Sequence, residues 1–484
     1  MIIKFTASML FNSVAFAFFL PIVFTLYWFV FQRKLKLQNL LVVLASYVFY
    51  GWWDWRFLSL IFISTFQDYF IALKIDQTSD KRKRRIWLLV SILVNIGILG
   101  FFKYYNFFID NFVEAFTLIG FKTNITSLQI ILPVGISFYT FQTLSYTIDV
   151  YKRKLEPTKD FIAFSAYVSF FPLLVAGPIE RATHLLPQFF AKRSFDYEKA
   201  VDGMRQILWG LFKKIVIADN CAVYVNYVFN NHHDSSGSTL WLGAIFFAFQ
   251  IYGDFSGYSD IAIGTARLFG INAIRNFNFP YFSRDIAEFW RRWHISLTTW
   301  FRDYVYIPLG GSRVSKQKVI RNTFIIFLIS GFWHGANWTF IVWGAFHAVL
   351  FLPLILLGKN RKNTDTVAEG KLLPNVKEIF QMGITFLLVV VGWVFFRAES
   401  IGQAFEYLAG MVQANLFTMP YSPGKTKLIF MIIMLLVEWL QRHKQHGLEI
   451  ASINKWIRRL IYVSIIMSIV FFMGKNEQFI YFQF

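Results

Sequence analysis

Residues 280–313 read PYFSRDIAEFWRRWHISLTTWFRDYVYIPLGGSR, and residues 327–348 read FLISGFWHGANWTFIVWGAFHA. Each segment contains a histidine directly after a tryptophan, His294 in the first and His334 in the second. Burying ionisable side chains among so many apolar residues costs free energy and requires a function or a compensating partner. We therefore predict that these two segments form the active site of a membrane enzyme.

The composition of the whole chain favours a lipid environment. Of 484 residues, 56% are hydrophobic and 16% are charged, whereas a soluble domain has about 25% charged residues. A membrane span needs roughly 20 apolar residues, and the candidates are 12–31, 38–53, 57–74, 86–105, 130–150, 160–178, 205–229, 239–253, 322–332, 337–357, 379–396, 427–441 and 459–473. Segments 254–271 and 284–308 are too polar for a simple span. The sequence predicts an all-α polytopic membrane protein, with residues 1–484 forming one transmembrane domain that contains re-entrant or interfacial helices.

The charge of the chain is strongly positive, with 48 Lys and Arg against 28 Asp and Glu. The basic residues form short clusters between apolar segments, a pattern typical of cytoplasmic loops and not of nucleic-acid binding. Segment 229–238 has no basic residue other than His232 and His233, and it is expected to face outside as a surface turn. No metal site is predicted, and the single cysteine, Cys221, excludes an intramolecular disulfide.

Segment 284–308 is predicted to be one helix that begins near Ser283 or Asp285 and ends at Pro308. On this helix Glu288 can pair with either Arg291 or Arg292. A helix lying at the lipid headgroups, with both arginines on phosphates, would also explain the pattern.

His334 lies between two glycines in GFWHGANW, residues 331–338. Glycine permits close approach of another backbone or of a substrate. A neutral imidazole can accept a proton from a hydroxyl group, although an isolated buried histidine more often bonds a neighbouring helix. We expect His347, late in the following apolar helix, to serve in packing.

A third polar segment, IYGDFSGYSDIAIG, spans residues 251–264. Its carboxylates, Asp254 and Asp260, could bind a cation, hold an arginine such as Arg267, or orient a histidine. For Asp260 we favour structural pairing. The sequence contains no Walker A loop, HExxH or GxSxG motif, so histidine base catalysis on a reactive acyl thioester is the chemistry it supports.

Several of these segments together resemble the membrane-bound O-acyltransferase family, and within it the bacterial alginate O-acetylase branch. The matching segments are LPVGISFYTFQTLSYTIDVY (132–151), FFPLLVAGPIER (170–181), DFSGYSDIAIG (254–264), FWRRWHISLTTWFRDYVYIPLGG (289–311), SGFWHGANWTFIVWGAFHA (330–348) and FIYFQF (479–484). The resemblance implies about eleven transmembrane helices around a central tunnel, with the core motifs in residues 130–350.

The resemblance also implies roles for particular residues. His334 would be the catalytic base, and His294 would shape the tunnel and assist. The residues expected to bind the donor or to line the cavity of the tunnel are Arg291, Arg292, Asn337, Asp254 and Tyr258. The donor would be acetyl-CoA, a substrate and not a permanently bound cofactor.

The acceptor implied by the resemblance is an extracytoplasmic polysaccharide, reached directly or through a secreted or anchored SGNH-type partner. The protein would then be a multi-pass protein of the bacterial inner membrane. Two alternatives are a D-alanyl transferase that uses a carrier-protein thioester and a non-catalytic transporter of acyl groups or polymer.

Overall fold

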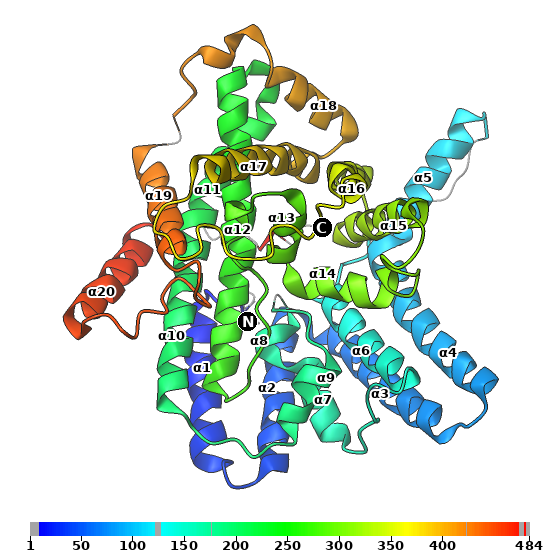
Figure 1. Cartoon of the computed structure of the whole chain (residues 1–484). Coiled ribbons are helices and arrows are strands. Elements are labelled where there is room, and N and C mark those ends of the chain that lie inside the picture. Colours follow the sequence, from blue (N-terminus) through cyan, green and yellow to red (C-terminus); the bar gives the residue numbers. More distant parts are fainter. Residues whose placement is uncertain (1–8, 122–126, 176, 423, 474–478, 481–484) are drawn as a thin grey trace, which may run out of the picture. The chain divides into compact units, whose positions relative to one another are not determined.

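The computed structural model describes residues 9–121, 127–175, 177–422, 424–473 and 479–480, and all regular secondary structure in these ranges is helical (Figure 1). The described chain divides into two compact units, Met1–Gly203 with Ala262–Ile274 and Met204–Ile261 with Arg275–Phe484. Helices α10 (Tyr197–Leu211) and α12 (Gly237–Leu268) have residues in both units. The expectation of an all-α protein is confirmed.

The first unit contains the N-terminal helices. They are α1 (Val14–Thr25), η1 (Leu26–Val30), α2 (Leu35–Asp54), η2 (Trp55–Phe57), α3 (Leu58–Gln77), α4 (Lys81–Leu99), η3 (Gly100–Tyr104), α5 (Tyr105–Leu118), α6 (Ile136–Tyr151), α7 (Phe161–Ser169), α8 (Phe171–Leu174), α9 (Ala182–Leu185) and η4 (Leu186–Phe189). The predicted span 160–178 is wrong, because the helix breaks at Phe170, two residues before Pro172. Proline cannot donate its backbone nitrogen to a continuing helix.

A buried polar network joins α3, α4 and α6 within the first unit. The carboxylate of Asp68, which is fully buried, accepts hydrogen bonds from Ser91 Oγ at 2.7 Å and Asn95 Nδ2 at 2.8 Å. Ser64 Oγ and Thr143 Oγ1 donate to the Asn95 side-chain oxygen at 3.1 and 3.3 Å. Polar side chains inside a helical membrane protein are tolerated when they satisfy one another across helices.

The second unit contains the remaining helices. They are η5 (Phe212–Ala218), α11 (Asp219–Asn230), η6 (His232–Asp234), η7 (Pro280–Phe282), α13 (Ile286–Arg292), α14 (Ile295–Phe301), η8 (Arg302–Tyr306), α15 (Lys316–His334), α16 (Trp338–Leu356), α17 (Val376–Arg397), α18 (Ile401–Gly410), η9 (Ala414–Phe417), α19 (Lys425–Leu440) and α20 (Lys455–Phe471). Most of α12 also belongs here. It continues through residues 254–268, so the predicted separation of 254–271 from the span 239–253 is wrong.

Buried ion pairs explain how a polar segment can continue an apolar helix. Lys214 Nζ lies 2.7 Å from Asp254 and 2.8 Å from Asp219, and Lys213 Nζ lies 2.6 Å from Asp260. Each carboxylate therefore has a cation beside it, which offsets its desolvation. The predicted structural pairing of Asp260 is confirmed.

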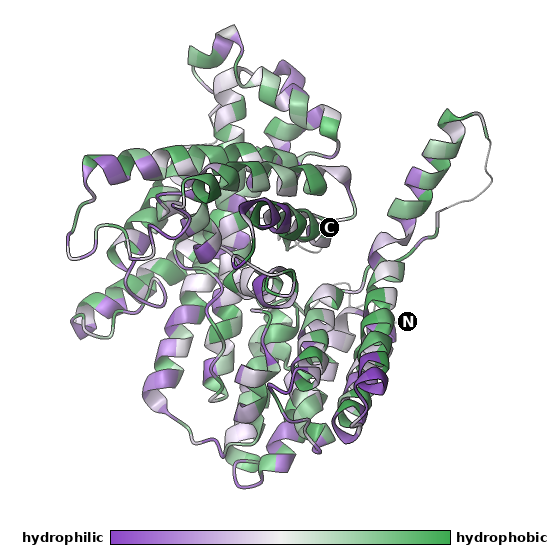
Figure 2. Ribbon diagram, turned by 45° about the vertical axis from the view of Figure 1, so that its right-hand side comes forward, coloured by the Kyte–Doolittle hydropathy of each residue, from purple (hydrophilic) through white to green (hydrophobic). Residues whose placement is uncertain are grey.

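Four segments of the described chain are long and apolar enough to cross a membrane: Leu35–Gln77, Lys81–Leu118, Trp338–Leu356 and Val376–Arg397. Figure 2 shows the long helices coloured mainly as hydrophobic, with hydrophilic residues gathered at helix ends and in connecting loops. The larger number of spans expected from the sequence stays a prediction.

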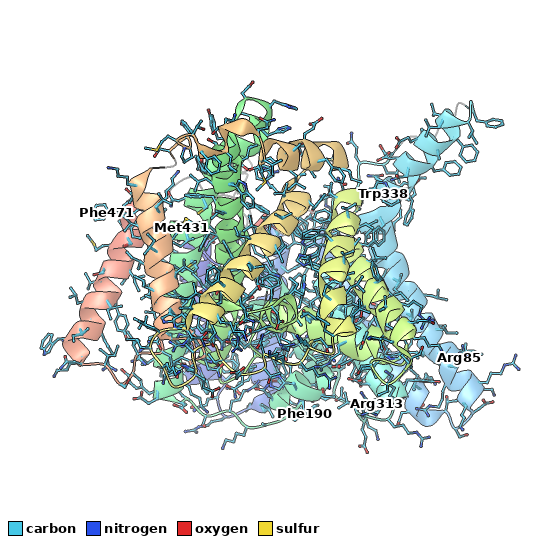
Figure 3. All side chains as sticks on the ribbon, turned by 45° about the horizontal axis from the view of Figure 1, so that its top comes forward. Arg85, Phe190, Arg313, Trp338, Met431 and Phe471 are labelled. Atoms are coloured by element: carbon cyan, nitrogen blue, oxygen red, sulfur yellow. The ribbon has the colours of Figure 1, made fainter. Side chains whose placement is uncertain are left out.

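Helices α15 and α16 pack closely through two glycines. A methyl group on Gly331 would collide with the carbonyl oxygen of Phe340, and one on Gly344 would collide with that of Phe327. Small residues permit this approach of two backbones in an apolar environment. Figure 3 shows Arg313, just before α15, and Trp338, at the start of α16, at opposite ends of this helix pair. Gly331 precedes His334 by three residues, so the close contact lies next to His334.

We expect Gly331→Ala to lower the free energy of unfolding by about 1–3 kcal/mol, the usual cost of overpacking a close contact. The matched control is Gly383→Ala, since a methyl group there meets no atom within 4 Å. Alanine favours a helix over glycine, so this control is expected to keep or slightly raise the unfolding temperature. Thermal unfolding in detergent, followed by tryptophan fluorescence, measures both. Equal behaviour of the two variants would contradict the packing argument.

Candidate active site

The chain changes direction at His294. Helix α13 (Ile286–Arg292) ends just before it and α14 (Ile295–Phe301) begins just after it. His294 has left-handed backbone angles, φ 43° and ψ 53°, which a residue with a side chain seldom adopts. The prediction of one helix over 284–308 is therefore wrong. Its start is confirmed, because Asp285 caps α13.

A short segment upstream holds this break in place. The backbone N–H of Asn278 donates to the Arg292 carbonyl at 2.9 Å, and the N–H of Ile295 donates to the Asn276 carbonyl at 2.9 Å. These two bonds engage backbone groups on either side of His294. Backbone strain persists only where the surroundings over-determine it, and it is concentrated at functional sites.

The side chain of Asn276 fixes the orientation of the His294 ring. Its Oδ1 accepts hydrogen bonds from the Ser296 backbone N–H at 3.3 Å and Ser296 Oγ at 2.9 Å, and it lies 3.1 Å from His294 Nδ1. Its Nδ2 donates to Ser259 Oγ at 3.0 Å. Because a backbone N–H can only donate, this atom of Asn276 must be the oxygen, and His294 Nδ1 must carry the proton. Nε2 is then the basic nitrogen of the neutral ring.

The two histidines predicted from the sequence are brought together. The ring centroids of His294 and His334 lie 6.4 Å apart, and both side chains are buried. Helix α15 presents His334 from its last turn, among the rings of Trp333, Trp343 and Phe396 at 5.0–5.5 Å. This aromatic enclosure favours neutral imidazoles, the form that can accept a proton.

His347 lies in the interior of the aromatic packing, as expected. Its Nδ1 accepts a hydrogen bond from Trp290 Nε1 at 3.3 Å, and its ring lies 5.2 Å from that of Trp343. Trp343 therefore contacts both His334 and His347.

A cavity of about 640 Å³ lies between α13, α14 and α15. Its walls are mainly apolar, and three guanidinium groups also line it, those of Arg291, Arg302 and Arg361. It reaches Ile295, the residue after His294, and Ser330, one helical turn before His334. The cavity can accommodate a long, mostly apolar ligand whose anionic end lies at the arginines.

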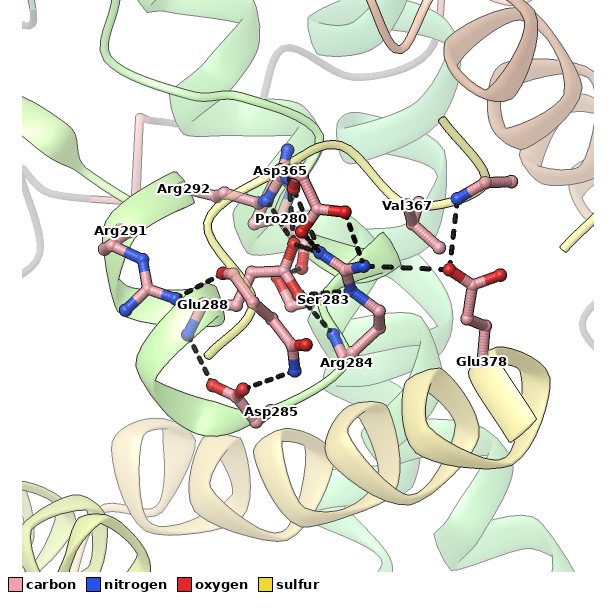
Figure 4. Close-up of polar contacts among 12 residues, drawn as sticks. Pro280, Ser283, Arg284, Asp285, Glu288, Arg291, Arg292, Asp365, Val367 and Glu378 are labelled. Carbon is pink, nitrogen blue, oxygen red and sulfur yellow. Dashed lines mark hydrogen bonds and ion pairs between the residues drawn. The ribbon is translucent and has the colours of Figure 1, made fainter. Parts of the chain in front are cut away.

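Of the two arginines predicted to bind the donor, Arg292 is engaged inside the protein. Its Nη2 donates to Glu288 at 2.8 Å and to the Asp365 carbonyl at 2.9 Å. Glu288 also accepts from Arg284 Nε at 3.0 Å, and Arg284 lies 2.9 Å from Asp365 and 3.6 Å from Glu378 (Figure 4). Glu288 thus pairs with Arg292, one of the two partners expected.

Arg291 is exposed and lines the cavity. It donates to the carbonyl oxygens of Asn360 at 2.9 Å and Asn363 at 2.6 Å. These bonds and those of Arg284 attach the 357–375 connection to α13. The guanidinium of Arg284 lowers the pKa of Asp365 by hydrogen bonding to it. The role of Arg291 and Arg292 in donor binding stays a prediction.

The other predicted site residues have internal partners. Asp254 pairs with Lys214 and accepts from the Ile480 backbone N–H at 2.6 Å. Tyr258 is buried, with its ring 4.4 Å from that of Phe479. Asn337 caps α16 by accepting from the Thr339 N–H, and its Nδ2 donates to the Glu399 carbonyl. Their roles at the cavity or toward a substrate stay predictions. Arg267, considered for Asp254 or Asp260, pairs with Asp202.

Sequence reasoning missed Asn276 and Trp343. Asn276 lies in an irregular segment 18 residues before His294, and no motif or periodicity marks it. Trp343 was one of several tryptophans in an apolar helix. Their importance follows from contacts that only the folded chain provides.

Comparison with known proteins identifies the family of this chain. The model of MBOAT, the membrane-bound O-acyltransferase family, matches residues 157–394. The probable alginate O-acetylase AlgI of Pseudomonas aeruginosa is 42% identical over 405 residues, which cover 83% of this chain and 75% of that protein. The peptidoglycan O-acetyltransferase of Helicobacter pylori is 40% identical over 437 residues, which cover 84% of this chain and 80% of that protein. The teichoic acid D-alanyltransferase of Bacillus subtilis is 29% identical over 282 residues, which cover 55% of this chain and 69% of that protein.

The chain is therefore an acyltransferase with several membrane-spanning helices. It belongs to the membrane-bound O-acyltransferase family, as the resemblance of its motifs implied.

We expect Arg284→Gln to release the 357–375 connection and to make trypsin cut it several-fold faster after Lys359, Arg361, Lys362 or Lys371. At neutral pH the Arg284–Asp365 pair is formed in the wild type. Because the pKa of Asp365 is lowered in the folded protein, its carboxylate stabilises the fold at pH values above the unfolded pKa of about 3.9. This contribution to stability is lost as the pH falls through the folded pKa.

The matched control is Arg56→Gln, which removes another arginine that pairs with an aspartate, Asp54. This variant should leave cleavage in 357–375 unchanged. Wild-type cleavage kinetics in Arg284→Gln, read by mass spectrometry, would contradict the role of Arg284 as an anchor.

Proposed function

We propose that this protein transfers an acetyl group from cytoplasmic acetyl-CoA across the bacterial inner membrane to hydroxyl groups of an extracytoplasmic polysaccharide. The acceptor receives the group directly or through an SGNH-type partner. The observation that carries the proposal is the buried pair His294 and His334 beside a cavity that three arginines line.

The cavity matches the two parts of the proposed donor. The pantetheine arm of acetyl-CoA is long and narrow, so it suits mainly apolar walls. The phosphates suit guanidinium groups, which bind them in bidentate fashion. Arg291 lines this cavity, whereas the Arg292 guanidinium is bound to Glu288. Of the two, Arg291 is therefore the stronger candidate for contact with the donor.

The proposed reaction needs one base. His334 accepts the proton of the acceptor hydroxyl as its oxygen attacks the thioester carbonyl, which forms a C–O bond. The C–S bond then breaks, and the proton passes to the departing thiolate. His294, whose Nε2 is basic, assists at the same centre. Acetyl-CoA is a substrate here, and the proposal includes no resident cofactor or metal in the reaction.

A second candidate is D-alanyl transfer from a carrier-protein thioester, which the similarity to a teichoic acid D-alanyltransferase supports. Both reactions require a histidine base and a thioester donor. They differ in the group transferred and in the donor, which is acetyl-CoA in one reaction and a carrier protein in the other. A non-catalytic transporter would require neither histidine for thioester cleavage.

The first test is thiol release from acetyl-CoA by the purified protein in lipid. Loss of a general base typically costs 10²–10⁴-fold, so we expect His334→Ala to lose about that much activity and His294→Ala to lose less. The control His443→Ala removes an exposed histidine and should act as wild type.

Equal activity of wild type and His334→Ala would reject His334 as the base. Activity with a D-alanyl carrier protein but not with acetyl-CoA would favour the second candidate. Absence of thiol release from either donor would reject both acyltransfer proposals for the isolated chain.

Asn276 gives a second prediction, because it acts on the substrate only through His294. We expect Asn276→Leu to lower kcat at least tenfold with little change in KM, since the ring loses its fixed orientation. Asn276→Asp keeps an accepting oxygen and should restore part of the rate. Asn278→Ala is the matched control, because the Asn278 side-chain oxygen has no hydrogen bond within the described chain. Similar kcat values for Asn276→Leu and Asn278→Ala would contradict a positioning role.

A further inference from the structure

Two histidines and a glutamate converge at a turn that is more than 50 residues away in sequence from His294 and His334. His232 and His233 lie in η6, the turn between α11 and α12, and Glu406 lies in α18. His232 Nε2 is 3.4 Å and His233 Nε2 is 3.8 Å from the same oxygen, Glu406 Oε2. The sequence predicts a surface turn here, since two adjacent histidines on one short loop seldom form a metal site alone. The structure adds a third group from a distant helix.

The orientation of His232 is fixed by the backbone. Its Nδ1 lies 3.1 Å from the Phe229 carbonyl oxygen, which can only accept a hydrogen bond. Nδ1 therefore carries a proton, and in the neutral ring the lone pair is on Nε2, the atom that faces Glu406. Metal-bound histidines almost always show this arrangement, in which the second ring nitrogen donates to a carbonyl or carboxylate.

The spacing of the three groups suits a small dication. Zinc binds histidine nitrogen and carboxylate oxygen at about 2.0–2.2 Å in tetrahedral geometry, which places neighbouring ligand atoms about 3.3–3.5 Å apart. The contact of His232 with Glu406 already has this length, and that of His233 is slightly longer. All three ligand atoms lie within 4.8 Å of one another. A small rotation of the exposed His233 and Glu406 side chains toward His232 would complete three tetrahedral positions and leave the fourth for water.

The elements that carry these groups are held against each other. The rings of Phe229 and Tyr407 stack with centroids 4.3 Å apart, and Tyr407 Oη donates to the Leu240 carbonyl at 2.8 Å. Figure 1 shows α18 beside the ends of α11 and α12. The Glu406 carboxylate thus comes from a helix already docked at the turn, which reduces the entropy cost of assembling a site.

We propose that His232, His233 and Glu406 form a site for a divalent transition-metal ion such as Zn²⁺, bound through the two Nε2 atoms and a carboxylate oxygen. An ion pair between a protonated His232 and Glu406 is the competing explanation of the contact. Protonation of His232 alone leaves unexplained why His233 Nε2 approaches the same carboxylate oxygen. Protonation of both rings is disfavoured, because their centroids lie 3.9 Å apart and two imidazolium cations would repel each other. A bound dication needs both rings neutral and joins them to one centre.

The test is isothermal titration of Zn²⁺ into the whole protein, purified in detergent through a tag without histidine and freed of metal with a chelator. We expect one equivalent to bind the wild type. His233→Asn and Glu406→Gln should each weaken binding at least tenfold, because each removes one of three ligands. Both residues are exposed, so these variants should fold, and size-exclusion chromatography checks this. The exposed His443→Asn is the matched control and should bind as wild type.

A thermal-unfolding measurement gives a second readout. Bound Zn²⁺ should raise the unfolding temperature of the wild type and of His443→Asn, but not that of Glu406→Gln. The proposal is overturned if the wild type binds no Zn²⁺, or if Glu406→Gln and His233→Asn bind as tightly as the wild type. Neither measurement depends on acyltransferase activity.

Discussion

The cost of burying charged and polar groups governs the structure of this protein. In the first unit, Asp68 is fully buried and accepts hydrogen bonds from neighbouring helices. In the second unit, Lys213 and Lys214 have carboxylate partners on α12. Each of these buried groups has a hydrogen-bonding or oppositely charged partner beside it. Removal of one partner would leave the other buried without compensation, which strongly destabilises a fold. These bonds join different helices, so they help to fix the register between helices whose apolar faces alone specify it poorly.

The same requirement for partners shapes the candidate active site. The 276–278 segment occupies backbone groups on both sides of His294, which interrupts what would otherwise be one helix. The interruption places His294 close to His334, and the Asn276 side chain selects which ring nitrogen is basic. The 276–278 segment therefore determines both the backbone conformation at His294 and the tautomer of its ring.

Arginines near the site have two different uses. Arg284 and Arg292 surround Glu288 and hold the 357–375 connection through Asp365. Arg291 also donates to carbonyl oxygens of this connection, and in addition it lines the cavity. The sequence shows an arginine pair at 291–292 but cannot assign these uses, because the acidic partner Asp365 comes from a loop more than 70 residues away. The same limit applies to His232 and His233, whose third neighbour, Glu406, belongs to α18.

The sequence by itself determined the all-helical class, most helix positions, the family and the two histidines, because apolar periodicity and family motifs are local properties of the chain. It was wrong at His294, where long-range contacts interrupt a helix, and at the junction of 253 and 254, where long-range ion pairs let α12 continue. It was also wrong for 160–178, where the helix breaks at Phe170 before Pro172. Only the tertiary structure decided the tautomer of His294, the partners of the arginines and the extent of the cavity. Each of these depends on hydrogen bonds or packing between distant segments, and side-chain order along the chain does not encode such distances.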